Sequence, residues 1–173
     1  MDQPDATIRP LNPSDQPSFY QLRLRALFEE PEIFMLAAGE FARMTLPDQT
    51  RMMRSTPDQF ILGAFNAEGT LVGLVDFHRR QRHKIRHLGD ISGMYVAPEH
   101  RARGIGRALL SAAISRARNL ADLEALTLIV SANDQPARRL YLSAGFQSYG
   151  LEPLSLKVEG KYVDGEFMML KLR

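Results

Sequence analysis

The sequence predicts an α/β fold, with helices packed on a mixed (α+β) sheet, and two observations carry this prediction. Short apolar segments of strand character alternate with segments in which apolar residues recur every three or four positions, as in helices that cover a sheet. The length of 173 residues suffices for one buried core and is too short to expect two domains. No linker or repeat divides residues 1–173, so we expect a single domain with the order β-α-α-β-β-β-α-β-α-β-β.

The N-terminal third predicts one strand and two helices. Residues 6–11 form a short strand, and Ser14 and Asp15 can cap the helix that follows, whose apolar side chains make one broad face. Residues 29–45 contain Pro31 and Gly39 and are followed by Pro47, so irregular or weakly helical structure is expected there. A second helix is expected over residues 47–55, with proline in its first turn.

The remaining chain predicts mainly strands, with a hairpin turn at residues 66–69. The segment 126–130 is fully apolar, which indicates a strand buried on both faces. Strands are expected at residues 60–65, 71–77, 88–96, 126–130, 154–158 and 162–172, with further strand material from residue 146, and helices are expected at 105–120 and 135–144.

A basic turn with two glycines connects the strand that ends at Val96 to the helix that begins at Ile105. Gly104 and Gly106 allow backbone N–H groups to approach a ligand with no Cβ in the way. The helix start then directs unpaired N–H groups and the positive end of its dipole at that ligand. A pyrophosphate suits this geometry. Three arginines add positive charge around it: Arg101, Arg103 and Arg107.

The spacing of this turn excludes two familiar phosphate loops. A Walker A loop needs Lys and then Ser or Thr after its last glycine, whereas Gly106 is followed by Arg107 and Ala108. The dinucleotide fingerprint needs three spaced glycines and a later acidic residue. The pattern Arg101-x-x-Gly104-x-Gly106 after a strand resembles the acetyl-CoA-binding motif of the GNAT family of N-acetyltransferases.

Residues 133–146 resemble a second GNAT motif, Asn-x-x-Ala-x-x-Leu-Tyr-x-x-x-Gly-Phe. The alignment places Asp134 in the asparagine position, where it also suits the N-cap of the following helix. Asn133 is our candidate for a cofactor contact. Asp134 is the weaker alternative, because an anion near pyrophosphate is unfavourable.

The resemblance implies a GNAT fold, acetyl-CoA as the acetyl donor, and an amine as the acceptor. It implies that Tyr141 protonates the departing CoA thiolate, whereas the sequence without the resemblance favours a tyrosine packed between helix and sheet. It also implies strand-like pairing of pantetheine with the strand before the turn. The cofactor contacts implied are Met94, Tyr95, Val96, Arg101, Ala102, Arg103, Gly104, Ile105, Gly106, Arg107 and Asn133.

The general base is less clear from the sequence. One position that carries glutamate in some GNAT members is Ile129 here, and it cannot titrate. Another falls on Asp90, which is our candidate base, with a surface carboxylate at the end of a strand as the alternative. Water suffices for an acceptor that resembles an α-amino group, because its pKa of about 8 leaves an appreciable neutral fraction at pH 7.

Composition narrows the remaining classes of function. The absence of cysteine excludes disulfides, thiolate metal sites and a cysteine nucleophile, and no metal is expected. No apolar run approaches the roughly 20 residues of a membrane helix, and residues 1–5 do not begin a signal peptide, so a cytoplasmic protein without a membrane partner is expected. The net charge of +2 argues against nucleic acid as a partner. The sequence leaves monomer and homodimer open.

Two regions, the basic segment 78–87 and the acceptor site, match no motif. Three histidines and five arginines or lysines within residues 78–87 suggest a solvated hairpin tip, or alternatively a surface that attracts acidic or RNA partners. The acceptor site is expected between residues 22–34 and the tail 162–168, with Tyr162, Asp164 and Glu166 as candidate contacts. The identity of the amine is not encoded in a motif. The alternative function is a GNAT domain that binds or senses acyl-CoA without turnover.

Overall fold

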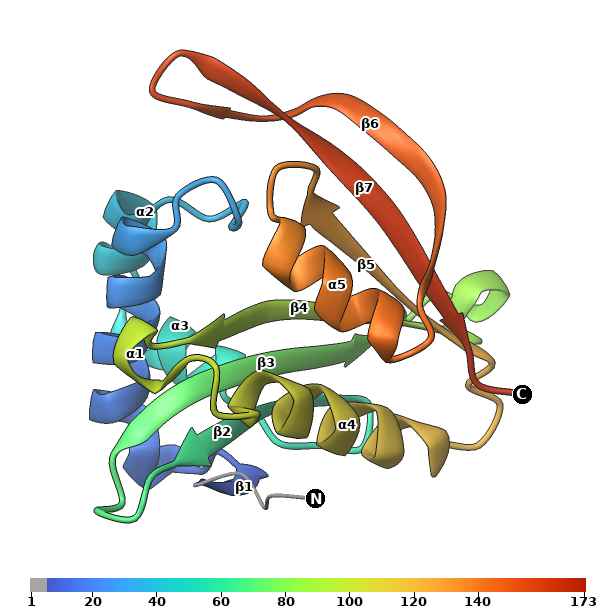
Figure 1. Ribbon diagram of the computed structural model, residues 1–173. Coiled ribbons are helices and arrows are strands. Elements are labelled where there is room, and N and C mark those ends of the chain that lie inside the picture. The colour runs from blue at the N-terminus through green and yellow to red at the C-terminus, as the bar shows by residue number, and fades with distance from the viewer. Residues whose placement is uncertain (1–5) are drawn as a thin grey trace.

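The computed structural model describes residues 6–173; the N-terminal segment 1–5 that was considered for a signal peptide lies outside the described residues. A seven-stranded sheet with the order β1-β2-β3-β4-β5-β7-β6 runs through the structure (Figure 1). Its strands are β1 (Thr7–Pro10), β2 (Gln59–Phe65), β3 (Leu71–Arg79), β4 (Leu88–Val96), β5 (Ala125–Ser131), β6 (Gln147–Val158) and β7 (Lys161–Lys171). The α-helices are α1 (Gln16–Glu29), α2 (Ala38–Ala42), α3 (Leu46–Met52), α4 (Ile105–Arg118) and α5 (Gln135–Ser143).

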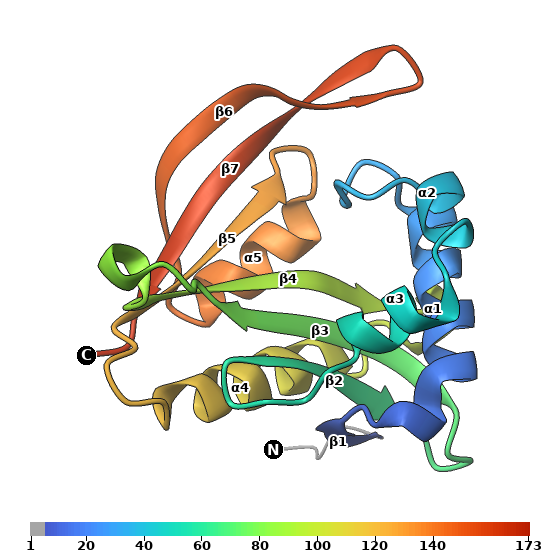
Figure 2. The same ribbon diagram turned by 180° about the vertical axis from the view of Figure 1, so that it is seen from behind.

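The helices cover opposite faces of the sheet and create two apolar layers. Helices α1 to α3 pack on one face, where Phe19 and Phe41 meet at a ring-centroid distance of 6.1 Å beside Leu74 of β3. Helices α4 and α5 pack on the other face, and Leu109 and Tyr141 join the core there. The two views from opposite sides show the α1 to α3 group at one end of the sheet and the β6–β7 hairpin arching over the other (Figures 1 and 2).

Strands β4 and β5 are the one parallel pair of the described sheet, and they pair over only three residues. The paired residues are Leu88 with Ala125, Gly89 with Leu126, and Asp90 with Thr127. All other neighbouring strands are antiparallel. Beyond Asp90 the two central strands therefore diverge and leave a gap in the middle of the sheet.

A β-bulge in β4 explains this divergence. Ser92 pairs with Asp76 but Tyr95 pairs with Leu74, so two residues of β4, Gly93 and Met94, oppose one residue of β3. Such a bulge bends its strand. Gly93 has a φ of +60°, and a Cβ there would collide with the Asp76 carboxylate, so glycine is required at this position.

Asp76 belongs to a buried ion pair that joins α1 to the sheet. Arg23 of α1 is 4% exposed, and one of its terminal nitrogens donates to both Asp76 carboxylate oxygens at 2.6 and 2.8 Å. Burial raises the pKa of Asp76, while the guanidinium opposes that rise. Removing either partner would leave an uncompensated charge in this layer.

Most expected elements occur, with three differences. The strand material expected from residue 146 and the first strand of the expected final hairpin form one continuous strand, β6, with register shifts before Leu156. The expected burial of residues 126–130 on both faces is wrong at Ile129, which is 37% exposed because β4 has already diverged from β5 there. The irregular segment 29–45 contains the short helix α2.

Part of the basic segment between β3 and β4 has a structural role. Arg79 is buried and donates to the Arg86 carbonyl at 2.7 Å, and Arg86 pairs with Asp58 at 3.1 Å. Arg80 pairs with Asp90. These three arginines fasten the turn to the sheet, so only part of the predicted basic tip is available to solvent or a partner. Within residues 6–173, no helix combines the length and apolarity needed to span a bilayer.

Candidate functional site

The gap between β4 and β5 leaves backbone groups of β4 without a strand partner. The Ala97 N–H donates to the Val72 carbonyl of β3 at 2.9 Å. Because backbone groups alternate in direction along a strand, Tyr95 also faces β3, whereas Met94 and Val96 direct their N–H and C=O groups into the gap. A ligand with amide groups can pair there as a strand would.

The N-terminus of α4 borders the same gap. Gly104 is its N-cap residue, has a φ of +76° and provides no side-chain cap. The first backbone bond of the helix runs from the Ala108 N–H to the Gly104 carbonyl at 3.0 Å, so the N–H groups of residues 105–107 lack an intrahelical acceptor. With the helix dipole, they form a site suited to a phosphate group.

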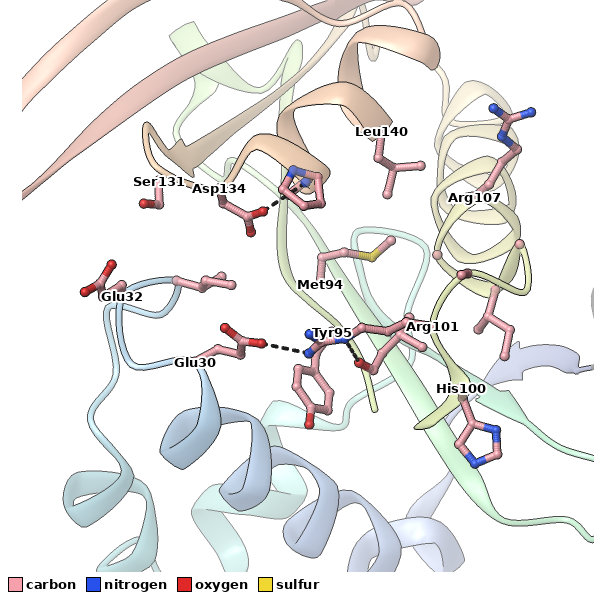
Figure 3. Close-up of a pocket in the computed structure, with 18 of the residues that line it drawn as sticks. Glu30, Glu32, Met94, Tyr95, His100, Arg101, Arg107, Ser131, Asp134 and Leu140 are labelled. Carbon is pink, nitrogen blue, oxygen red and sulfur yellow. Dashed lines mark hydrogen bonds and ion pairs between the residues drawn. The ribbon is translucent and has the colours of Figure 1, made fainter. Parts of the chain in front are cut away.

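These two features share one cleft of about 680 Å³, which is in the usual range for a cofactor site. Figure 3 shows the cleft between the end of α1, the gap in the sheet and the starts of α4 and α5. Ten of the eleven expected cofactor residues line it, and Arg103 does not: the ten are Met94, Tyr95, Val96, Arg101, Ala102, Gly104, Ile105, Gly106, Arg107 and Asn133. It is also lined by Glu30, Glu32, Ile33, His100, Ser131, Asp134, Pro136, Ala137 and Leu140.

The charges of the cleft are divided between its walls. Arg107, on the α4 side, is exposed and forms no ion pair among the described residues. Arg101 is already engaged, because its Nε donates to the Val96 carbonyl and its terminal nitrogen pairs with Glu30, each at 2.8 Å. Glu32 lies on the wall opposite Arg107 (Figure 3). The cleft is therefore basic near α4 and acidic near the end of α1.

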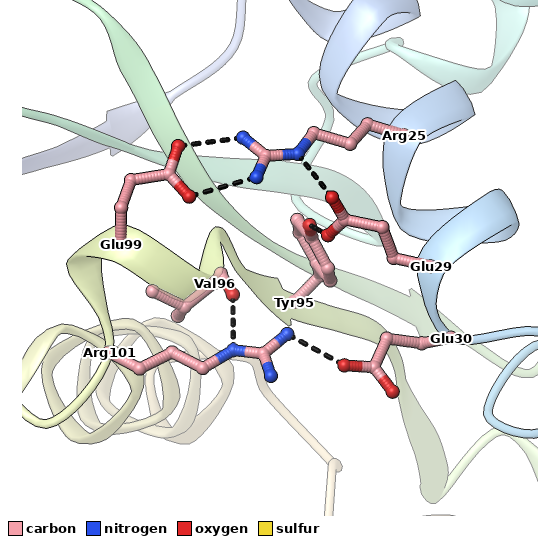
Figure 4. Close-up of polar contacts among 7 residues, drawn as sticks. All are labelled: Arg25, Glu29, Glu30, Tyr95, Val96, Glu99 and Arg101. Carbon is pink, nitrogen blue, oxygen red and sulfur yellow. Dashed lines mark hydrogen bonds and ion pairs between the residues drawn. The ribbon is translucent and has the colours of Figure 1, made fainter.

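Arg101 is one member of a polar network that fastens α1 to the turn before α4 (Figure 4). Arg25 donates to both Glu99 oxygens at 2.7 and 2.8 Å and to Glu29 at 2.7 Å. The Tyr95 hydroxyl donates to Glu29 at 2.5 Å. The Tyr95 hydrogen bond and Arg25 lower the pKa of Glu29, and Arg25 lowers that of Glu99 to about 2. We call these five residues and Glu30 the α1 latch.

Tyr141 lies beside the cleft, not on its surface. The residue is 7% exposed and packs in the core with its ring 5.9 Å from that of Phe146. Burial raises the pKa of Tyr141, and the nearby charge of Asp134 adds to the rise, so the phenol stays protonated throughout the neutral range. The structure gives its hydroxyl no hydrogen-bond partner among residues 6–173, while Leu140, its neighbour on α5, lines the cleft.

Asp90 lies away from the cleft, and its carboxylate already accepts hydrogen bonds from two side chains. It is the last residue of β4 that pairs with β5, about 13 Å along the strand from Met94 at roughly 3.3 Å per residue. Arg80 donates to it at 2.7 and 3.0 Å, and Thr127 donates a further short hydrogen bond. Burial raises the pKa of Asp90, but the bonds from Arg80 and Thr127 outweigh it and lower the pKa below its usual range. This environment suits a structural ion pair better than a base.

Asn133 and Asp134 both line the cleft, and Asp134 also caps α5 as predicted. The Asp134 carboxylate accepts from the Ala137 N–H at 3.0 Å and caps α5. This satisfies the start of α5, in contrast to the uncapped start of α4. Asn133 is exposed and lines the cleft.

A second, smaller cavity of about 20 Å³ adjoins the cleft and shares Glu32, Ile33 and Ser131 with it. Of the three expected acceptor contacts, Asp164 lines it, whereas Tyr162 is exposed outside it and Glu166 pairs with Arg138 at 2.7 Å. The other residues that line it are Met35, Ile129, Val130, Ser155, Leu156, Val163 and Gly165.

Sequence reasoning did not identify Glu30 or the latch residues Arg25, Glu29 and Glu99. Only the spacing of Arg25 and Glu29, four residues apart on a helix, was a local signal. The contacts with Glu99 and Tyr95 join residues 74 and 66 positions apart, so no local pattern reveals them.

Comparison with known proteins agrees with the geometry. A family model described as "Acetyltransferase (GNAT) family" matches residues 17–146. A mycothiol acetyltransferase of Acidothermus cellulolyticus is 30% identical over 168 residues, which cover 87% of this chain but 47% of the relative. The L-amino acid N-acyltransferase MnaT of Escherichia coli is 34% identical over 91 residues, 53% of this chain and 49% of the relative. The chain thus spans about half the length of both relatives.

The fold also matches that of yncA from Salmonella typhimurium, whose structure was solved with its cofactor acetyl-CoA. The TM-score is 0.84 at 22% identity, with 97% of this chain and 94% of that chain covered. At this identity the likeness concerns the fold. The uncapped helix start, the unpaired strand and the size of the cleft are the features of this chain that fit such a cofactor.

Proposed function

Because this chain belongs to the GNAT family of acetyltransferases, we propose that it transfers the acetyl group of acetyl-CoA directly to an amine in a ternary complex. The observation that carries this proposal is the cleft that joins the unpaired backbone of β4 to the uncapped N-terminus of α4. One part suits the amide groups of a pantetheine arm, and the other suits a pyrophosphate.

Cofactor binding is assigned to the two ends of this cleft. The backbone of Met94 and Val96 would pair with the pantetheine amides, and the N–H groups at the start of α4 would bind the pyrophosphate with Arg107 beside them. Arg103 would add long-range attraction from outside the cleft. Asn133 would contact the pantetheine arm from the start of α5.

The transfer requires a polarised thioester carbonyl, a neutral amine and a protonated leaving thiolate. Backbone N–H groups of β4 that face the gap would polarise the carbonyl. We assign protonation of the thiolate to Tyr141, which is protonated at neutral pH and lies on α5 next to the cleft-lining Leu140. Its hydroxyl has no hydrogen-bond partner among the described residues, so the O–H is free to donate its proton.

We propose that Asp90 has a structural role and that the acceptor loses its proton near the cleft. A lysine-like amine with a pKa of about 10.4 is neutral in about one molecule in 2,500 at pH 7, which costs about 4.6 kcal/mol. An amine with a pKa of about 8 costs about 1.4 kcal/mol, and water can accept its proton. Asp90 lies too far along β4 and is bound by Arg80 and Thr127.

The alternative function is binding of acyl-CoA without turnover. Two observations favour it: Tyr141 is buried beside the cleft instead of lining it, and Ile129 stands where some family members carry glutamate. Both functions require the same cofactor contacts, so cofactor binding alone does not separate them.

Thiol release from acetyl-CoA, measured over amino acids, aliphatic amines, polyamines and peptide N-termini, tests the proposal. We expect amine-dependent thiol release, with the acetylated amine identified by mass spectrometry. Tight binding of acetyl-CoA with no amine-dependent release over the whole panel would instead support the binding protein.

A further inference from the structure

The small cavity adjoins the cleft, and its lining is suited to one chemical class of acceptor. Glu32, Ile33 and Ser131 line both cavities, so they lie where the cleft and the small cavity meet. The volume of about 20 Å³ is only slightly larger than the volume that one water molecule needs. It accommodates a small end group, such as an aminomethyl group, while the remainder of the acceptor lies along its rim.

Most of the cavity wall is apolar and comes from three separate parts of the chain. Ile33 and Met35 come from the segment after α1, Ile129 from β5, and Leu156 and Val163 from the β6–β7 hairpin. Met35 is 80% exposed and Ile129 is 37% exposed, so both present apolar surface to an incoming molecule. An acceptor with an apolar chain would cover this surface and be stabilised by the hydrophobic effect.

The charge of the cavity has one sign. Glu32 forms no ion pair among residues 6–173, unlike the neighbouring Glu30, which pairs with Arg101. Asp164 also lines the cavity and accepts from the Leu154 N–H at 2.9 Å. No lysine, arginine or histidine of the described chain lines it. A cationic group is therefore attracted to this cavity and an anionic group is repelled.

We infer that the acceptor is a primary amine on an apolar chain with no carboxylate of its own, and that Glu32 binds its ammonium group. This inference rests on the proposed acetyl transfer and narrows its acceptor. A free amino acid, the acceptor class named for the Escherichia coli relative, would bring its carboxylate close to Glu32 with no cation to receive it.

The proton balance of the reaction assigns Glu32 the role of passing one proton from the ammonium group to solvent. One ammonium proton leaves before attack and passes by way of the Glu32 carboxylate to solvent. The amine nitrogen then forms a bond to the acetyl carbon, and the bond between that carbon and sulfur breaks. The second proton lost from nitrogen is balanced by the proton that the thiolate receives, so the products are the amide, free CoA thiol and one proton in solution.

Three acceptors with the same branched chain test this inference: isoamylamine, leucinamide and leucine. They differ only in carrying a hydrogen, a carboxamide or a carboxylate beside the amine. We expect kcat/KM for isoamylamine and leucinamide to exceed that for leucine by at least about tenfold, because the leucine carboxylate is repelled by Glu32 and the other two acceptors carry no such charge. Only the neutral amine reacts, and isoamylamine is more basic than leucine, so a smaller fraction of it is neutral at the same pH. A difference in ionisation alone would therefore favour leucine.

Two substitutions then assign the preference to Glu32. Glu32→Gln should raise the KM for isoamylamine about tenfold, leave the KM for acetyl-CoA unchanged, and reduce the ratio of isoamylamine to leucine activity. Glu32→Lys should invert that ratio. Glu68→Gln, which changes an exposed carboxylate in the β2–β3 turn, is the matched control and should leave every value unchanged.

The outcomes separate this inference from the proposed function. Equal activity on leucine and isoamylamine, or an unchanged ratio in Glu32→Gln, overturns the inference while acetyl transfer stands. Release of thiol with none of the amines overturns acetyl transfer. In that case, calorimetric titration of the CoA-bound protein with isoamylamine and leucine still decides the inference, because it requires that isoamylamine bind more tightly and that Glu32→Gln remove the difference.

Discussion

Tyr141 illustrates what a single residue contributes beyond its motif. Its place in the Leu-Tyr-x-x-x-Gly-Phe pattern predicted a role as acid, whereas the structure places it in the core against Phe146. Burial keeps the phenol protonated, which is the form that an acid requires, but it also makes the phenol a weaker acid. The proton can pass to a thiolate only if the thiolate is held in an equally dry environment, where its own pKa rises.

Tyr141→Phe is expected to reduce kcat by about 100-fold or more, within the range usual for the loss of a general acid, and to leave the KM for acetyl-CoA unchanged. The ring and its packing remain, and the hydroxyl has no partner among the described residues, so the melting temperature should stay close to that of the wild type. Steady-state thiol release and thermal denaturation provide these values. An unchanged kcat, with chemistry shown to limit turnover, would remove the acid role.

At the scale of the element, the start of α4 combines a helix terminus with space for a ligand. A Cβ at Gly106 would meet Leu140 Cδ2 at 3.5 Å and Met94 Cε at 3.7 Å, which are ordinary contacts. Alanine therefore fits at this position. A larger side chain would extend among Leu140, Met94 and Val96, all of which line the cleft.

We expect Gly106→Leu to weaken binding of CoA by at least about tenfold, because its side chain occupies the space that the ligand requires. Gly106→Ala is the matched control: it should bind CoA nearly as well as the wild type and be equally or slightly more stable, since alanine is favoured over glycine in helices by up to about 1 kcal/mol. Calorimetry measures both affinities. Equal affinities in the two variants would show that the ligand does not approach this position.

Elements with a strong local signal were predictable from the sequence, and those that depend on distant contacts were not. The start of α4 and the cap by Asp134 follow from residue types a few positions apart. The continuity of β6 does not, because Pro153 lies within the strand, and its pairing with β7 shifts register between Glu152 and Leu156 and then resumes. The exposure of Ile129 depends on the bulge at Gly93 in another strand.

At the scale of the whole molecule, the α1 latch connects the layer that carries Glu32 to the turn that begins α4. Arg25 is central, because it binds both Glu29 and Glu99. The Glu99 carboxylate has a pKa lowered to about 2, chiefly by Arg25. A carboxylate with a lowered pKa in the folded state adds stability above its unfolded pKa of about 4.3, and this contribution is lost as the pH falls toward 2.

Arg25→Met is therefore expected to lower the melting temperature by about 1–3 °C at pH 7, as suits exposed ion pairs in a protein of this size. The difference from the wild type should be constant between pH 7 and 5 and should narrow below about pH 4. Arg54→Met is the control, because Arg54 is exposed and forms no ion pair among the described residues. A difference that persists undiminished at pH 3 would show that Arg25 acts through packing and not through charge.

The gap between β4 and β5 has a consequence for how the protein behaves when it is empty. Strand edges normally lie at the borders of a sheet, where charges, prolines or bulges discourage association with other chains. Here a pair of edges faces inward, and the backbone groups of Met94 and the Val96 N–H are as open to a foreign strand as to a cofactor, while the Val96 carbonyl already accepts from Arg101. A cofactor that pairs with these groups would cover them, so we expect the protein to aggregate less in the presence of acetyl-CoA than without it.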